Sequence, residues 1–155
     1  MKLARLLALL IPATLLAGAW AFQLIGHLVP CEMCHWQRWP LYAALVPAIL
    51  AFAPGLRPPV IRLLIALAAL GIIASGVIGF YHMGVEYKWW LGPTHCTSQG
   101  LPHGGDILKA LLAQPLVLCD KPQWTLFGIS LAGFNALISI PGGLLTLFLA
   151  AKGRS

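Results

Sequence analysis

Charged residues are scarce in this chain. They make up 9% of its 155 residues, whereas 59% of the residues are hydrophobic. Soluble domains carry roughly 25% charged residues, so too few polar side chains are present here to cover a surface that faces water. The shortage of charge excludes an ordinary soluble domain and predicts a membrane protein.

Four long hydrophobic stretches stand out against this shortage. A helix needs about 20 apolar residues to cross about 30 Å of hydrocarbon. The stretches cover approximately residues 6–25, 36–53, 60–81 and 124–151. We therefore expect one all-α domain over residues 1–155, built as a four-helix transmembrane bundle.

Small residues recur in the third stretch. Gly71, Ser75 and Gly79 follow a spacing that lets another helix backbone approach closely, as helices in membranes often do. We expect this face of the third helix to form a tight helix–helix contact.

The first stretch could also be interpreted as a signal peptide. Lys2 and Arg5 precede its apolar run, and the small residues at 17–19 resemble a cleavage site. The apolar run of about 20 residues is longer than the 7–15 typical of a signal peptide. We therefore expect a retained span.

Acidic residues are the rarest charged type, and their placement predicts the topology. With four spans, both termini and the connection at 54–62 share one side, which holds none of the four acidic residues. The same side holds six of the ten basic residues, namely Lys2, Arg5, Arg57, Arg62, Lys152 and Arg154. By the positive-inside rule this side is cytoplasmic, and we expect a multi-pass protein of the bacterial inner membrane. The net charge of +6 is then a topology signal and gives no support to nucleic-acid binding.

The chain has only four cysteines, and this topology places all of them on the outer, periplasmic side. Cys31 and Cys34 lie in a short first loop, and Cys96 and Cys119 lie in a long second one. Disulfides persist in such an oxidising compartment, so the cysteines are candidates for disulfide chemistry.

The two outer loops differ greatly in length. They cover approximately residues 26–35 and 84–123. Loops as long as the second are uncommon and are usually functional or disordered. Residues 104–115 have the pattern of a short amphipathic helix, with Asp106 as a candidate N-cap and Pro115 at the end. We expect this helix to lie on the membrane surface.

The motif CEMCH at residues 31–35 is open to several interpretations. Its spelling is that of a c-type haem attachment site, with His35 as an axial ligand. Zinc would need all four thiolates or added ligands such as His35 and His95, although structural zinc sites more often show two closely spaced pairs. Two inert disulfides in a non-enzymatic membrane protein are a further alternative, but a loop as short as C-x-x-C stabilises little.

A redox-active dithiol is the fourth interpretation. Cys31 stands where the second span begins, and a helix N-terminus lowers the pKa of a thiol and favours the reactive thiolate. On a helix Cys31, Cys34 and Arg38 share one face. A cation at this depth is expected to be functional, and it could stabilise a thiolate or a reduced electron acceptor. The alternative is that Arg38 only extends toward water.

Over essentially its whole length the chain resembles the bacterial disulfide bond formation protein B (DsbB) family. The matching elements are the four spans, PCEMCHWQRWP at residues 30–40, Cys96 in GPTHCT and Cys119 in CDKPQWTLFGISLAGFN. C-x-x-C alone is a weak signal, but C-x-x-C-x-x-x-R followed by two loop cysteines in a four-span chain is specific. The vitamin K epoxide reductase type, another four-helix dithiol–quinone family, has its loop cysteines before the C-x-x-C.

This resemblance implies a thiol:quinone oxidoreductase that supports disulfide bond formation. Cys96 would be attacked by a reduced thioredoxin-fold partner of the DsbA type, and Cys119 would be released and reoxidised by exchange with Cys31. Cys34 would face the quinone and pass two electrons to it, with Arg38 stabilising the resulting charge.

The same resemblance implies a quinone-binding pocket at the outer end of the third span. His82 and Glu86 would line it, although His82 fits the role of a simple interfacial histidine equally well. The expected cofactor is a membrane quinone, ubiquinone in preference to menaquinone, and no metal is expected.

Overall fold

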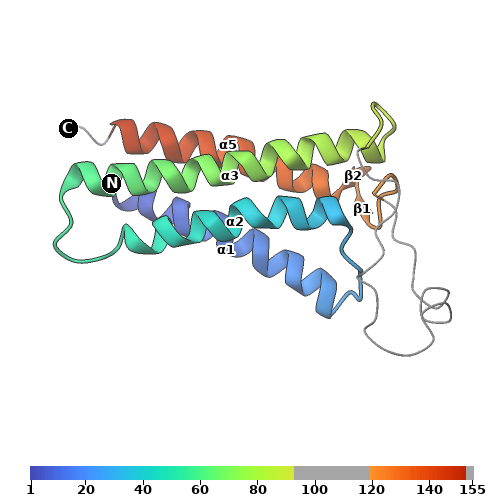
Figure 1. Cartoon of the computed structure of the whole chain (residues 1–155), viewed down its shortest axis with the longest axis horizontal. Coiled ribbons are helices and arrows are strands. Elements are labelled where there is room, and N and C mark those ends of the chain that lie inside the picture. Colours follow the sequence, from blue (N-terminus) through green and yellow to red (C-terminus); the bar gives the residue numbers. More distant parts are fainter. Residues whose placement is uncertain (93–118, 153–155) are drawn as a thin grey trace, which may run out of the picture.

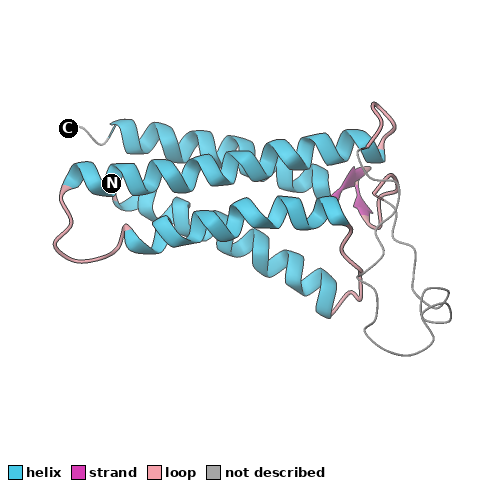
Figure 2. Ribbon diagram, in the orientation of Figure 1, coloured by secondary structure: helices cyan, strands magenta, loops and turns pink. Residues whose placement is uncertain are grey.

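The structure of the protein is a computed structural model that describes residues 1–92 and 119–152. Four long helices, α1 (Lys2–Leu24), α2 (Glu32–Leu50), α3 (Pro58–Glu86) and α5 (Leu131–Lys152), form an elongated bundle (Figure 1). A small antiparallel hairpin of β1 (Thr125–Leu126) and β2 (Ile129–Ser130) lies at one end of it (Figure 2). The start of α1 and the end of α5 lie at the opposite end, as the predicted topology requires of the two termini.

Three of the described helices, α1, α3 and α5, are long and apolar enough to cross a membrane. The chain is therefore an all-α membrane protein that crosses the bilayer more than once, as its composition predicts. Helix α2 is similar in length, but its first half carries Glu32, Gln37 and Arg38 among its apolar residues. Its assignment as a fourth span stays a prediction.

The small-residue face of α3 forms the close contacts that its spacing predicts. A Cβ atom added to Gly71 would lie 2.9 Å from the backbone oxygen of Pro40 in α2. One added to Gly79 would lie 2.9 Å from the backbone oxygen of Ala132 in α5. Ser75, between them, is fully buried. Helix α3 is thus the central element, with α2 and α5 packed closely against it.

The fourth helix begins later than the hydrophobic stretch at 124–151 predicts. Residues 125–130 form the hairpin instead, because Phe127 (φ 52°) and Gly128 (φ 76°) adopt left-handed backbone conformations that no α-helix accommodates. The side-chain oxygen of Ser130 accepts a hydrogen bond from the backbone N–H of Gly133 at 3.2 Å. Ser130 therefore caps α5, which is a common role for serine directly before a helix.

Helix α3, by contrast, runs further than the predicted end near Tyr81. It continues to Glu86, so His82 and Glu86 stand one turn apart on one helix. Helix α2 likewise begins at Glu32, which makes Cys31 its N-cap residue. The predicted surface helix at 104–115 lies outside the described residues.

Candidate functional site

The two cysteines of the C-x-x-C motif lie at the N-terminus of α2. Cys31 is buried, and its sulfur accepts a hydrogen bond from the backbone N–H of Cys34 at 3.2 Å. The two Sγ atoms are 2.7 Å apart, with both residues present as thiols. The pair can therefore interconvert between dithiol and disulfide with little movement of the backbone.

The environment of Cys31 differs from the one that its position predicts. The hydrogen bond with the Cys34 thiol and burial raise the pKa of the Cys31 thiol, against the lowering effect of the Cys34 amide. Both effects favour the neutral thiol over the charged thiolate. The lowering of the Cys31 pKa that the helix N-terminus predicts is present through the Cys34 amide, but it is outweighed, so the pKa is raised overall.

Cys119, although distant in sequence, lies near Cys31 and Cys34 at the N-terminus of α2. It is buried in one small cluster with Cys31, Met33 and Val85, and Cys34 packs against this cluster. Of the four predicted catalytic cysteines, the structure thus brings three together. Cys96 lies outside the described residues.

Two contacts fix the chain that follows Cys119. Lys88, just beyond α3, forms an ion pair with Asp120. The side-chain amide of Gln123 donates a hydrogen bond of 2.7 Å to the backbone oxygen of Val29, in the first loop. The end of the second loop is thereby tied both to α3 and to the loop that carries Cys31.

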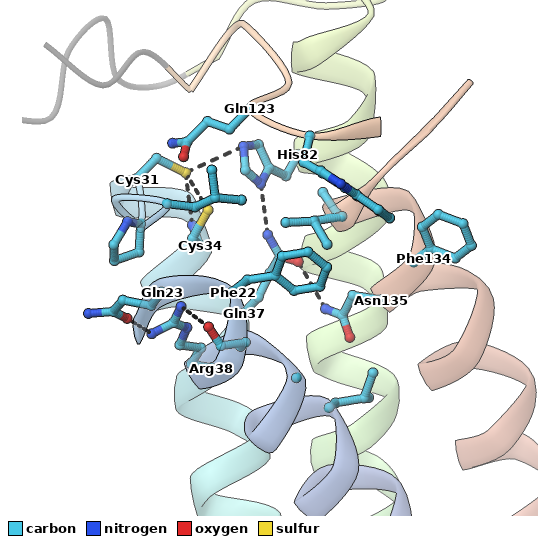
Figure 3. Close-up of a pocket in the computed structure, with 18 of the residues that line it drawn as sticks. Phe22, Gln23, Cys31, Cys34, Gln37, Arg38, His82, Gln123, Phe134 and Asn135 are labelled. Carbon is cyan, nitrogen blue, oxygen red and sulfur yellow. Dashed lines mark hydrogen bonds between the residues drawn. The ribbon is translucent and has the colours of Figure 1, made fainter. Parts of the chain in front are cut away.

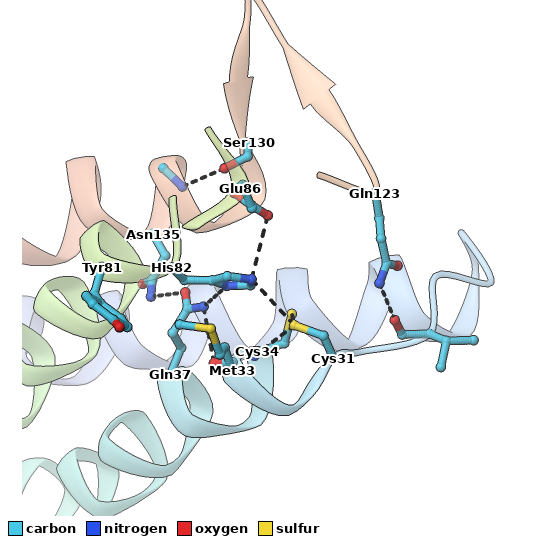
Figure 4. Close-up of polar contacts among 12 residues, drawn as sticks. Cys31, Met33, Cys34, Gln37, Tyr81, His82, Glu86, Gln123, Ser130 and Asn135 are labelled. Carbon is cyan, nitrogen blue, oxygen red and sulfur yellow. Dashed lines mark hydrogen bonds and ion pairs between the residues drawn. The ribbon is translucent and has the colours of Figure 1, made fainter. Parts of the chain in front are cut away.

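His82 stands beside the cysteine pair, as Figure 4 shows. Its Nε2 atom is 3.6 Å from the sulfur of Cys31 and 3.8 Å from Oε1 of Glu86. Its Nδ1 atom is 2.7 Å from Nε2 of Gln37. His82 is buried at 2% exposure. It is therefore part of a connected buried site and not an interfacial histidine at the surface.

Arg38 points toward α1. Its guanidinium donates hydrogen bonds to Oε1 of Gln23 at 2.7 Å and to the backbone oxygen of Ala19 at 3.3 Å, and it lies 5.6 Å from the ring centre of Trp20. The side chain is half-buried. These contacts hold the cation against α1 and favour a positioned cation over a side chain that only extends toward water.

A cavity of about 390 Å³ joins these groups (Figure 3). Arg38, Cys34, His82 and Glu86 contribute to its wall from α2 and α3. Most of the remaining wall is apolar and comes from α1 and α5, including Leu15, Phe22, Leu131, Phe134 and Ile138. Such a space, apolar with a few convergent polar groups, has the character of a site for a small organic molecule.

The ligand types of a metal site are also present. The sulfurs of Cys31 and Cys34 and a ring nitrogen of His82 lie within 4.8 Å of one another. His35, the histidine of the literal haem motif, is exposed to solvent. The histidine that lies next to the sulfurs is therefore His82, which comes from a different helix.

Four polar residues of the site were not predicted as site residues from the sequence. Gln23 binds Arg38, while Gln37, Ser75 and Asn135 form a hydrogen-bonded group on the other side of His82. Each is a polar side chain inside a long apolar stretch, where such groups are costly unless they are paired. A polar residue within an apolar stretch was therefore the feature of the sequence that could have indicated these four residues.

Comparison with known proteins supports the resemblance. The family model of "Disulfide bond formation protein DsbB" matches residues 1–149. An uncharacterized protein of Rickettsia prowazekii is 28% identical over 147 residues, which cover 90% of this chain and 81% of that protein. Disulfide bond formation protein B of Methylococcus capsulatus is 30% identical over 139 residues, which cover 81% and 79% respectively. No solved structure matches the chain. By the extent of the family match, with its cysteine pair beside a buried histidine and an apolar cavity, the chain belongs to the DsbB family of disulfide bond formation proteins.

Proposed function

We propose that this protein oxidises a dithiol of a periplasmic thioredoxin-fold partner of the DsbA type and passes the electrons to a membrane quinone. Membership of the DsbB family supports the role in disulfide formation. The observation that carries the proposal is the place of Cys31, which shares one buried cluster with Cys119 and lies next to Cys34 at the cavity wall.

The thiol chemistry would proceed by exchange between sulfurs. A thiolate of the partner attacks Cys96 of a Cys96–Cys119 disulfide, which releases Cys119 as a thiolate. Cys119 then attacks Cys31 of the Cys31–Cys34 disulfide and releases the Cys34 thiolate. The burial of Cys119 and Cys31 in one small cluster supports this second step, because the two sulfurs must meet for it.

Two further exchanges complete the oxidation of the partner. Its second thiolate attacks the mixed disulfide, which leaves the partner as a disulfide and releases Cys96. Cys96 attacks Cys119 and releases Cys31 as a thiolate. The partner has then lost two electrons and two protons, and Cys31 and Cys34 hold the two electrons as a reduced pair.

The residues around the cavity fit a quinone. A bound quinone would supply an acceptor for two electrons and two protons, which restores the Cys31–Cys34 disulfide. The apolar wall from α1 and α5 suits its ring and tail, and a volume of about 390 Å³ lies in the range of small-molecule sites. Among the described residues, Oε2 of Glu86 is a buried oxygen with no hydrogen-bond partner.

The polar residues of the wall would each have a separate task. Arg38 is a permanent cation and would stabilise negative charge on the reduced acceptor or on Cys34. Glu86 and His82 would contact the polar edge of the ring. We propose ubiquinone as the acceptor, in preference to menaquinone.

The proposal includes the sidedness of the membrane. The cysteine end of the bundle would face the periplasm and the termini the cytoplasm, in agreement with the excess of Lys and Arg around the termini. The soluble partner would reach Cys96 from the water, whereas the quinone would enter from the bilayer.

Quinone reduction by the purified protein tests the proposal. Reduced partner and quinone should react catalytically with wild type, and Cys34→Ser or Cys96→Ser should each abolish turnover. His35→Ala is the matched control, because this exposed neighbour of Cys34 should be dispensable. Full activity of either cysteine variant would refute the relay, and a haem absorption band that is lost in His35→Ala would favour the haem interpretation.

A further inference from the structure

We propose that the buried amide groups of Asn135 and Gln37 determine which nitrogen of His82 carries the proton, and that they direct its Nε2–H toward the sulfur of Cys31. The assignment of the proton follows from hydrogen-bond chemistry alone. Its purpose, a donor for the Cys31 thiolate, rests on the proposed function.

The orientation of Asn135 is fixed first. Its Nδ2 atom lies 3.2 Å from the backbone oxygen of Ser75, which can only accept a hydrogen bond. The hydroxyl of Ser139 donates to its Oδ1 at 2.8 Å. The Ser75 carbonyl requires the NH₂ group of Asn135 to point toward Ser75 and α2, and the Ser139 hydroxyl, which can donate or accept, is compatible with this orientation.

The orientation of Gln37 follows from that of Asn135. The Nδ2 of Asn135 donates to Oε1 of Gln37 at 2.9 Å. The NH₂ group of Gln37 therefore points the other way, where it donates to the backbone oxygen of Met33 at 3.3 Å. This carbonyl also accepts only, so the two ends of the Gln37 amide are fixed independently and in agreement.

The proton of His82 is then determined. The NH₂ group of Gln37 faces Nδ1 of His82 at 2.7 Å and has only donors to offer, so Nδ1 must accept. A neutral imidazole with an accepting Nδ1 carries its proton on Nε2. Nε2 lies 3.6 Å from the sulfur of Cys31 and 3.8 Å from Oε1 of Glu86.

This arrangement makes His82 a hydrogen-bond donor on the side of the cysteines, where the sulfur of Cys31, Oε1 of Glu86 and the backbone of Cys119 are its acceptors. When an exchange releases Cys31 as a thiolate, the Nε2–H can donate to the sulfur while the proton stays on the ring. A hydrogen bond to the charged form stabilises it, and burial alone would not. Gln37 and Asn135 are thus positioning residues, because they act on the sulfur only through His82.

The titratable groups around His82 come from several elements. Cys31 and Cys34 face it from the start of α2, Glu86 from its own helix, and Cys119 through a backbone hydrogen bond. Helix α5 faces it with the neutral Asn135, and the sequence of α5 has no charged residue before Lys152.

The same network disfavours metal binding. A histidine that binds a metal through Nε2 needs a free lone pair there and usually donates its Nδ1–H to an acceptor. Gln37 offers Nδ1 a donor instead. The reduced cysteine pair, which together with His82 has the ligand types of a zinc site, is thereby protected from zinc.

Nitrogen NMR of the full-length protein with labelled histidine tests the assignment directly. The His82 signals, identified by their loss in His82→Asn, should show a protonated Nε2 and an unprotonated Nδ1 at mildly alkaline pH. A protonated Nδ1, or an even mixture of the two forms, would overturn the proposal. Once the His82 signals are identified, the wild-type spectrum decides this without any measurement of turnover.

Variants that change the hydrogen-bond donor at Nδ1 of His82 into an acceptor should change which nitrogen of His82 is protonated. In Gln37→Glu the carboxylate can only accept, so the proton should move to Nδ1. In Asn135→Asp a carboxylate faces Oε1 of Gln37, so only the Met33 carbonyl still holds the wild-type orientation of the Gln37 amide, and a fraction of the His82 proton should move to Nδ1. Ser139→Ala is the matched control, because the Ser75 carbonyl still orients Asn135, and its spectrum should equal that of wild type. A wild-type proton position in both network variants would refute the inference.

Two further measurements separate this role from a merely structural one. Zn²⁺ alone should bind reduced Asn135→Asp roughly tenfold more tightly than reduced wild type, a typical effect of a group that orients a metal ligand. Gln37→Leu should lower kcat roughly tenfold, because Nδ1 of His82 loses its hydrogen-bond donor. If the NMR result holds and wild type shows no quinone activity, the proposed function fails but the proton assignment stands.

Discussion

Arg38 of α2 donates a hydrogen bond of 2.7 Å to the side-chain oxygen of Gln23 in α1. This contact joins two helices on either side of the cavity and holds the guanidinium at its wall. The proposed quinone site therefore depends on α1 as well as on the helix that carries the cysteines.

Arg38→Met should raise the KM for quinone about tenfold or more, because a hydrogen bond to a charged group contributes about 1.5–3 kcal/mol. Gln23→Leu keeps the charge but frees the side chain, so its KM should rise less. Steady-state kinetics with varied quinone distinguishes the two. An unchanged KM in Arg38→Met would mean that Arg38 only contacts α1 and does not contribute to quinone binding.

Cys34→Ser should accumulate a disulfide between Cys31 and Cys119. The two residues lie in one small buried cluster, and the variant removes the competing partner of Cys31. Mass spectrometry of peptides from oxidised, non-reduced protein would identify the link. Cys34→Ser combined with Cys119→Ser is the control, and a link from Cys31 to Cys96 in Cys34→Ser would contradict the proposed order of exchange.

The stability of the reduced protein should fall as the pH rises above about 8.5, the ordinary pKa of a cysteine. The folded state raises the pKa of Cys31 and keeps its proton, while the unfolded chain releases it. Stability is therefore greatest below the unfolded pKa and is lost as the pH rises toward the folded one. Thermal unfolding in detergent should show this slope in wild type and a weaker one in Cys31→Ser. Equal slopes would contradict the assignment.

Gly71→Ala should destabilise the protein by about 1–3 kcal/mol, the usual effect of overpacking a tight contact. The added Cβ would meet the Pro40 backbone oxygen at 2.9 Å, and a backbone cannot easily move aside. Gly18→Ala is the matched control, since no atom lies within 4 Å of its added Cβ. The thermal midpoint should fall only in the first variant, and equal midpoints would mean that α2 and α3 separate readily.

Sequence patterns predicted the helices better than their ends. Apolar stretches and the glycine spacing of α3 indicated the bundle, because the membrane requires long apolar helices and close contacts require small residues. The start of α5 was misplaced, because hydrophobicity does not distinguish Phe127 in a tight turn from the same residue in a helix.

The part of the candidate site that lies in one short sequence motif could be predicted. Cys31, Cys34 and Arg38 lie near one another in sequence, and the family resemblance added Cys119, His82 and Glu86. Gln37 and Asn135 were not predicted, since their importance depends on which way each amide points. That orientation is set by contacts between three different helices.

The sulfur of Cys31 also caps helix α2, through the hydrogen bond from the Cys34 amide. The same sulfur atom would therefore both take part in thiol–disulfide exchange and cap the helix. In the proposed exchange, a Cys31 sulfur that turns toward Cys119 would leave the Cys34 amide without its acceptor, and the first turn of α2 would be less stable until the sulfur returns. The local stability of the N-terminus of α2 would thus depend on the redox state of the cysteines. Amide hydrogen exchange at Cys34 would detect this dependence.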